Sequence, residues 1–214
     1  MSYEATGRFA LLPAPAGLTL VQDLLNTIPA GRPRKPDLLS TTELAAAWLA
    51  TAASNWASAI GAPPPLLPEV GENDLSALRR LRDAVGVAVR TGTGCYEGPR
   101  PAPVTGSLSL TLDGTSRVST APRGTTPAGW LRSAVLAEML EAQRVDMWRR
   151  LKVCRNDSCA VAFYDRSRNN SGVWHDVRVC GNAINLRASR GRRSGRDVTQ
   201  AGPGAAPDAS ATTA

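Results

Sequence analysis

The sequence has little histidine, little cysteine and few aromatic residues. Its 214 residues include one His and four Cys, and aromatic residues account for 5% of the chain. Alanine is abundant by contrast, so packed helices are favoured over a sandwich of aromatic-rich strands. A single imidazole also leaves histidine-based catalysis with only one candidate base.

Long apolar runs are missing as well. No stretch of about 18 apolar residues occurs, as a membrane-spanning helix would need. The first residues, M-S-Y-E-A-T-G-R, lack the charged and apolar regions of a secretory signal. We therefore expect a cytoplasmic protein that does not enter a membrane.

Acidic residues are scarce in one part of the chain. Between Trp148 and Arg196, twelve Lys or Arg stand against three acidic residues, whereas the rest of the chain has a net charge of −2. A charged surface that only kept the protein in solution would spread its charge along the chain. The concentration of positive charge instead indicates a polyanionic partner, nucleic acid before membrane.

Three helices are expected in the first half of the chain. The first spans Leu18 to Ile28, and a loop rich in proline, glycine and arginine ends it. The second follows a capping box, Ser40 to Glu43, and contains the stretch L-A-A-A-W-L-A-T-A-A. The third runs from about Asp74 to Arg90. Its apolar stripe consists of Leu75, Leu78, Leu81, Val85 and Val89, and its other side carries Arg79, Arg80 and Arg82.

The pattern then changes to strands and returns to helix. From residue 104 to 120, apolar and polar residues alternate around Asp113-Gly114, which predicts a β-hairpin. A last long helix begins near Thr126, with Pro127 at its first position, and extends to about Arg150. Its inward-facing residues are expected to be Leu131, Val135, Met139 and Leu140.

Most of the residues that could bind a metal lie close together. Cys154 and Cys159 are separated by four residues, as are His175 and Cys180, and fifteen residues lie between the pairs. Two closely spaced pairs supply the four ligands of a structural zinc ion at little cost in loop closure. The alternative is that buried cysteines and a core histidine fill space. The spacing favours one structural Zn2+ with no open position for hydrolysis.

Arginines surround and follow this candidate zinc site. Guanidinium groups pair with phosphates or with the edge of guanine, and the alternative role of such a run is to keep a terminus soluble. We expect DNA contacts from Arg166, Arg168, Arg178, Asn182, Arg187, Arg190, Arg192 and Arg193.

The same region resembles the CGNR-type zinc finger. The resemblance is carried by C-R-N-D-S-C (Cys154 to Cys159), F-Y-D-R-S-R-N (Phe163 to Asn169), Trp174 and C-G-N (Cys180 to Asn182). Upstream, D-L-L-N-T (Asp23 to Thr27) is similar to a D-F-V-N-T box of the helical ABATE domain. That domain precedes the finger in a family of stress-induced transcription regulators. The resemblance implies a bacterial regulator with a C-terminal, zinc-dependent DNA-binding module.

Two positions depart from the family pattern. The stretch G-V-W-H, which ends at His175, stands where the family usually has R-R-W-C. Histidine remains a competent zinc ligand. Ala183 stands where the family has arginine, so DNA contacts would depend on the other arginines.

The expected fold class is mainly α with a small β-hairpin, a helical N-terminal domain being followed by a small C-terminal zinc-binding module. The helical domain is expected to sense a small molecule or to assemble into homo-oligomers. The expected divisions are an irregular N-terminus at 1–17, an ABATE-like helical domain at 18–148, a CGNR-type zinc finger at 149–196 and a disordered tail at 197–214.

A DNA-binding transcription regulator is the favoured function. The alternatives are a protein-interaction module with a purely structural zinc ribbon, and a small-molecule-binding protein. In the last case Asp23 and Asn26, one helical turn apart, would line a ligand pocket unless they make core hydrogen bonds. No enzyme is expected, because the only histidine is assigned to zinc and no catalytic residue emerges. Cys95 has no evident cationic neighbour to lower its pKa.

Overall fold

The chain divides into two compact units, Met1–His175 and Asp176–Ala214. The computed structural model describes residues 4–31 and 33–182. This part is mainly α-helical with two small antiparallel sheets, which confirms the expected fold class. The division follows His175. The expected domain boundary between residues 148 and 149 remains a prediction, and the expected tail at 197–214 lies outside the described residues.

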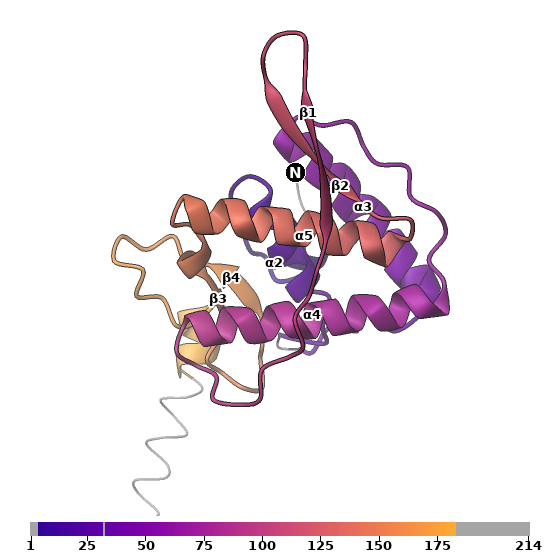
Figure 1. Cartoon of the computed structure of the whole chain (residues 1–214). Helices are drawn as coiled ribbons and strands as arrows, with labels where there is room; N and C mark the ends of the chain where they lie inside the picture. Colours follow the sequence, from indigo (N-terminus) through magenta and orange to yellow (C-terminus); the bar gives the residue numbers. More distant parts are fainter. Residues whose placement is uncertain (1–3, 32, 183–214) are drawn as a thin grey trace, which may run out of the picture. The chain divides into compact units, whose positions relative to one another are not determined.

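Helices are the main regular structure of the first unit. Figure 1 shows α4 and α5 running beside each other, with the hairpin of β1 and β2 extending beyond α5. None of the described helices is long and apolar enough to cross a lipid bilayer. The elements of this unit are α1 (Glu4–Gly7), α2 (Leu18–Leu25), α3 (Thr42–Ile60), α4 (Glu72–Gly92), β1 (Ser107–Leu112), β2 (Val118–Arg123), α5 (Pro127–Arg144), η1 (Trp148–Arg150), β3 (Leu151–Val153) and β4 (Ala162–Tyr164).

Local signals place most of these elements. The hairpin pairs Leu112 with Val118 across the predicted Asp-Gly turn. Pro127 is the first residue of α5, as predicted, and the Thr126 hydroxyl accepts a hydrogen bond from the Gly129 N–H (3.1 Å). Proline has no N–H, but this costs no hydrogen bond at the first position, because the first N–H groups of a helix have no acceptor within the helix.

Several helices differ from the sequence predictions. Helix α2 ends at Leu25 rather than at Ile28. The cap of α3 is Thr41 rather than Ser40, since its hydroxyl accepts from the Leu44 N–H. Residues 4–7 form α1 within the segment predicted to be irregular. Helix α5 ends at Arg144 instead of about Arg150, and Asp146 adopts a positive φ of 59° before η1 begins.

One stripe of α4 forms part of the hydrophobic core, as predicted. All five of its expected apolar residues, from Leu75 to Val89, are buried. On α5 the prediction is wrong for Leu140, which is 49% exposed. Leu131 and Val135 are buried as predicted, and Ala142 shares their face, because positions four or seven apart lie on one side of a helix.

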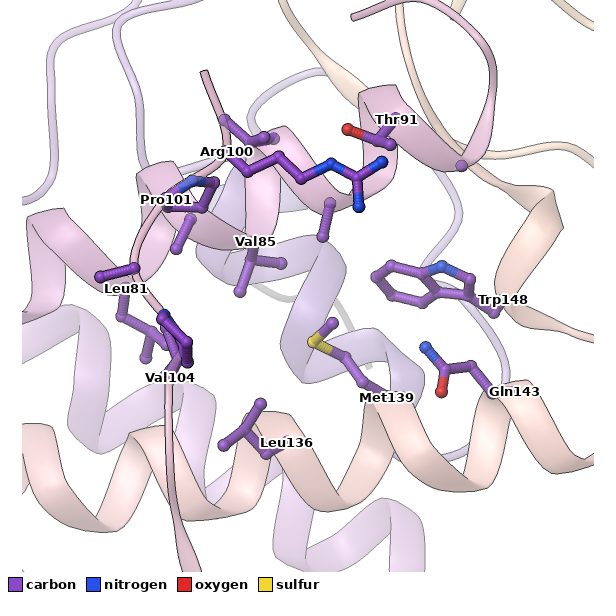
Figure 2. A pocket seen from close by; sticks show the side chains of 16 residues that line it. Leu81, Val85, Thr91, Arg100, Pro101, Val104, Leu136, Met139, Gln143 and Trp148 are labelled. Atoms are coloured by element: carbon purple, nitrogen blue, oxygen red, sulfur yellow. The ribbon is translucent and has the colours of Figure 1, made fainter. Parts of the chain in front are cut away.

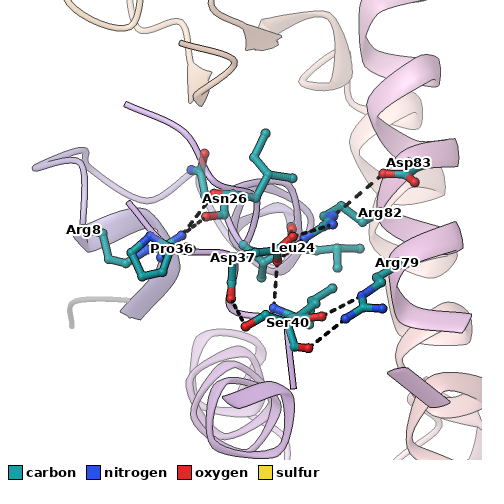
Figure 3. Close-up of polar contacts among 12 residues, drawn as sticks. Arg8, Leu24, Asn26, Pro36, Asp37, Ser40, Arg79, Arg82 and Asp83 are labelled. Carbon is teal, nitrogen blue, oxygen red and sulfur yellow. Dashed lines mark hydrogen bonds and ion pairs between the residues drawn. The ribbon is translucent and has the colours of Figure 1, made fainter. Parts of the chain in front are cut away.

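Arg82 was predicted to lie on the polar side of α4, but its side chain is buried. Its guanidinium donates to both carboxylate oxygens of Asp37 (2.7 and 3.1 Å) and to the Thr27 hydroxyl (3.1 Å). Two further arginines donate to backbone carbonyls of the same 26–40 segment (Figure 3). Arg8 reaches the carbonyls of Asn26, Ile28 and Pro36, and Arg79 those of Leu39 and Ser40. These three arginines therefore hold a loop together.

Asn26 joins the helices to β4. Its side-chain carbonyl accepts from the Ala162 N–H (2.9 Å), and its side-chain NH2 donates to the Ala162 carbonyl (3.0 Å). The carboxamide thus bonds the free edge of β4 as the backbone of a neighbouring strand would. Leu151 and Ala162 belong to the same core as the helices, which explains why the first unit extends past residue 148.

Asp23 and Asn26, predicted either to line a ligand pocket or to make core hydrogen bonds, make core hydrogen bonds in the structure. Both side chains have 0% exposure. The Asp23 carboxylate accepts from the Thr6 N–H (2.8 Å) and the Trp48 indole N–H (2.9 Å). The core hydrogen bonds considered as the alternative account for both residues.

We expect Asn26→Ala to lower the free energy of unfolding by about 3 kcal/mol. The substitution leaves the buried N–H of Ala162 without a partner and its carbonyl with only the longer bond from Gln22 Nε2 (3.4 Å), and an unsatisfied buried group costs about 1–3 kcal/mol. Urea unfolding followed by circular dichroism measures the change. Asn73→Ala, at an exposed position on α4, is the matched control. Equal stability of the two variants would contradict the structural role of Asn26.

Candidate metal centre

A short two-stranded sheet positions the first two candidate metal ligands. Strands β3 and β4 pair antiparallel, with Val153 opposite Ala162. Cys154 follows β3 directly, and its N–H donates to the Val161 carbonyl (2.9 Å). The Cys159 N–H donates to the Asn156 carbonyl (2.7 Å), which closes a tight turn. This turn brings both thiols to the same end of the sheet.

A neighbouring loop supplies the third ligand. The Arg155 N–H donates to the Val173 carbonyl (3.0 Å), so the chain leading to His175 runs beside the cysteine turn. His175 Nδ1 then lies 3.3 Å from Cys159 Sγ. The family pattern has cysteine at this position, and the imidazole reaches the cluster in its place.

Cys180 lies on η2 (Val177–Gly181), the one element that the structure describes in the second unit. The Asp176 carboxylate begins this turn by accepting from the N–H groups of Arg178 (2.7 Å) and Val179 (3.1 Å). The Cys180 N–H donates to the Asp176 carbonyl (2.9 Å). These local bonds fix the backbone that carries the fourth thiol.

The four donor atoms form one cluster that suits a zinc ion. The three Sγ atoms and the imidazole nitrogen all lie within 4.8 Å of one another, and the three cysteines are buried. Tetrahedral zinc, with Zn–S near 2.3 Å and Zn–N near 2.0 Å, separates its ligands by about 3.5–3.8 Å. The cluster therefore fits one structural zinc ion, and four protein ligands leave no position for a reactive water.

Electrostatics at the cluster favour the thiolate form that zinc requires. A hydrogen bond from Cys159 lowers the pKa of Cys154, and hydrogen bonds from His175 act in the same direction, against the effect of burial. Three thiolates and a neutral imidazole around Zn2+ leave a net charge of about −1. Acid would compete with the metal, because zinc binding displaces the thiol protons.

A buried ion pair shapes the loop between Cys159 and His175. The Lys152 ammonium donates to Asp165 Oδ2 (2.7 Å) and to the carbonyls of Asn170 (2.6 Å) and Gly172 (3.0 Å). Asp165 also accepts from the N–H of Gly172 (2.7 Å). A Cβ on Gly172 would lie 2.9 Å from this carboxylate, so a larger residue would displace it. Burial opposes the charge of Asp165, but hydrogen bonds from Lys152 and Ser167 outweigh it and lower its pKa to about 2.

The structure separates the predicted DNA-contacting residues into three groups. Arg166 already has partners within the protein, since its guanidinium donates to the Pro13 carbonyl (2.7 Å) and stacks over Tyr164. Arg168, Arg178 and Asn182 are exposed. Arg187, Arg190, Arg192 and Arg193 lie outside the described residues.

The thiol of Cys95 has a cationic neighbour that the sequence does not reveal. Cys95 is exposed, and a hydrogen bond from Arg155 lowers its pKa. Sixty residues separate the two in sequence, so no local motif connects them. Arg155 is therefore a cationic neighbour that is not evident from the sequence alone.

The comparison with known families agrees with this geometry. Residues 150–193 match the model of the CGNR zinc finger, which covers about a fifth of the chain. No curated protein matches the chain in sequence. The matched segment contains all four clustered ligands, so a zinc-finger module is present in this protein.

We expect Cys159→Ser to reduce the zinc content from one ion per chain to well below one. A serine hydroxyl is a poor zinc ligand compared with a thiolate. Elemental analysis of the purified full chain measures the stoichiometry. Cys95→Ser is the matched control, because Cys95 lies outside the cluster, and it should retain one zinc. Equal zinc content in the two variants would contradict the assigned ligand set.

Asp165→Asn is expected to lower the free energy of unfolding by about 3 kcal/mol. It leaves the ammonium of Lys152, whose side chain is 12% exposed, without its counter-charge. Because the pKa of Asp165 falls from 3.8 to about 2 on folding, its stabilisation is complete above pH 3.8 and disappears as the pH falls toward 2.

Urea unfolding of wild type and Asp165→Asn, repeated across this pH range, measures the effect. The difference between them should shrink below pH 3.8. Asp157→Asn, which removes an exposed carboxylate from the neighbouring turn between Cys154 and Cys159, should change stability little at any pH. A pH-independent difference for Asp165→Asn would show that the loss does not come from the charge.

Proposed function

We propose that this protein binds DNA through its zinc-held basic module and regulates transcription. The observation that carries the proposal is the placement of charge: residues 148–196 hold twelve of the 25 Lys and Arg and only three acidic residues. Such a local excess attracts the phosphate backbone. The match of residues 150–193 to the CGNR zinc finger supports the same conclusion.

The internal hydrogen bonds sharpen this argument. Arg149 pairs with Asp146, Arg150 donates to the carbonyls of Asp165 and Ser167, and Lys152 is enclosed by three acceptors. Arg168 and Arg178 are exposed and make no hydrogen bond or ion pair through their guanidinium groups within residues 4–31 and 33–182. They are therefore the described arginines best suited to phosphate contacts.

The first unit would then supply regulation. The D-L-L-N-T box at its start resembles the ABATE domain of stress-induced transcription regulators, which supports a role in sensing or in assembly of bacterial regulators. The reducing cytoplasm is the compartment in which three clustered thiols would stay available to zinc. No catalytic role is proposed, because the single histidine belongs to the four-ligand cluster.

Protein binding is the second candidate function, and one feature favours it. The hairpin exposes one apolar face, with Leu110 73%, Leu112 69% and Val118 61% exposed. Adjacent exposed apolar side chains of this kind mark protein contacts in other proteins. On this hypothesis the zinc module is structural, and a second copy of the chain is one candidate partner for the hairpin.

We expect the double variant Arg168→Gln/Arg178→Gln to weaken DNA binding and to reduce its salt dependence. Each phosphate contact contributes a slope of about −0.9 in log K against log salt, so the slope should become shallower by about 1.8. Fluorescence anisotropy with a labelled duplex, titrated at several salt concentrations, measures both quantities.

Arg117→Gln/Arg144→Gln removes the same charge from exposed positions outside the basic segment and should leave the slope unchanged. Alanine substitution of Arg187, Arg190, Arg192 and Arg193 extends the test to the rest of the cluster. If wild type fails to bind duplex DNA even at low salt, the DNA proposal is wrong. Loss of a co-purifying protein with intact DNA binding would favour the protein-interaction alternative.

A further inference from the structure

An apolar pocket of about 500 Å³ lies between α4, α5 and the segment 99–104. Its floor consists of aliphatic and thioether side chains from the two helices, including Leu81, Val85, Leu136 and Met139. Figure 2 shows the Met139 side chain and the Trp148 ring pointing into the same space. A concave, mostly apolar site of this size is typical of small-molecule binding.

The segment over the pocket cannot fill it. Its sequence, P-R-P-A-P-V, has proline at every second position from Pro99. Proline fixes φ and disfavours helical geometry in the residue before it, so the segment stays extended and presents short side chains. Of its six residues only Val104 packs against the core. The space between the helices is therefore left open by the local sequence.

Three polar side chains at this pocket have no partner among the residues that the structure describes. Figure 2 shows the Arg100 guanidinium reaching over the pocket between Thr91 and Trp148. Within the described residues, no hydrogen bond or ion pair involves the guanidinium of Arg100, the carboxamide of Gln143 or the indole N–H of Trp148. No acidic residue is among the described residues that line the pocket. A single unpaired cation thus stands at the rim of an apolar cavity.

We propose that this pocket binds an amphipathic monocarboxylate, such as a medium-chain fatty acid. The aliphatic chain would lie along Leu81, Val85 and Leu136, and the carboxylate would pair with the two-pronged donor of Arg100. Gln143 and Trp148 supply further donors for the same head group. One guanidinium in an apolar setting suits a single negative charge better than a doubly charged phosphate. This proposal does not depend on DNA binding.

Isothermal titration of the full chain with octanoate tests the proposal, with octanamide as the uncharged ligand of the same shape. Octanoate should bind at least tenfold more tightly than octanamide. Arg100→Gln should weaken octanoate binding at least tenfold and leave octanamide unchanged, because it removes only the charge. Arg117→Gln, an exposed arginine on the hairpin turn, is the matched control and should bind octanoate as wild type does.

A second variant tests the apolar floor. Ala88 lines the pocket from α4, and Ala88→Phe should remove binding of both ligands by filling the space; thermal unfolding checks that this variant folds. Arg100 lies on an exposed segment, so Arg100→Gln tests the proposal even if Ala88→Phe does not fold. No binding of octanoate by wild type, equal affinity for the two ligands, or unchanged octanoate binding by folded Ala88→Phe would overturn the proposal.

Discussion

The paired hydrogen bonds between the Asn26 carboxamide and the Ala162 backbone are the interaction on which the rest of the structure depends. A two-stranded sheet of three residues per strand is too small to be stable by itself, and the free edge of β4 would bury unpaired polar groups. Asn26 satisfies both groups of Ala162 at once. The turn that carries Cys154 and Cys159 is consequently built onto the helical core, and the ligand geometry inherits the rigidity of that core.

The features that could be predicted from sequence are those with local causes. The buried stripe of α4 repeats every three or four residues, the hairpin follows from its Asp-Gly turn, and Pro127 marks the start of α5. The four zinc ligands were also predictable, because they occur as two closely spaced pairs. Each of these signals lies within a few residues of the element or ligand that it specifies.

The features that escaped prediction depend on partners distant in sequence. Asn26 and Ala162 are 136 residues apart, and Arg82 and Asp37 are 45 apart. An arginine on the polar side of a helical pattern is expected to face water, and nothing near Arg82 in the sequence indicates a carboxylate partner. The contact between Cys95 and Arg155 was not predictable for the same reason, because the two residues are far apart in sequence. The net charge of a segment also does not show which of its cations can reach a partner. Lys152 and Arg168 count equally in it, although Lys152 is enclosed and Arg168 is exposed.

The long separation between Asn26 and Ala162 has a consequence for how the protein forms in the cell. The ribosome synthesises α2 long before β4. The carboxamide of Asn26 therefore has no Ala162 backbone to bond until the intervening chain has been made. Contacts of such high sequence separation form late, because closing the intervening loop costs entropy before any contact offsets it. Completion of the helical core and docking of the turn that carries Cys154 and Cys159 therefore both depend on the synthesis of β4.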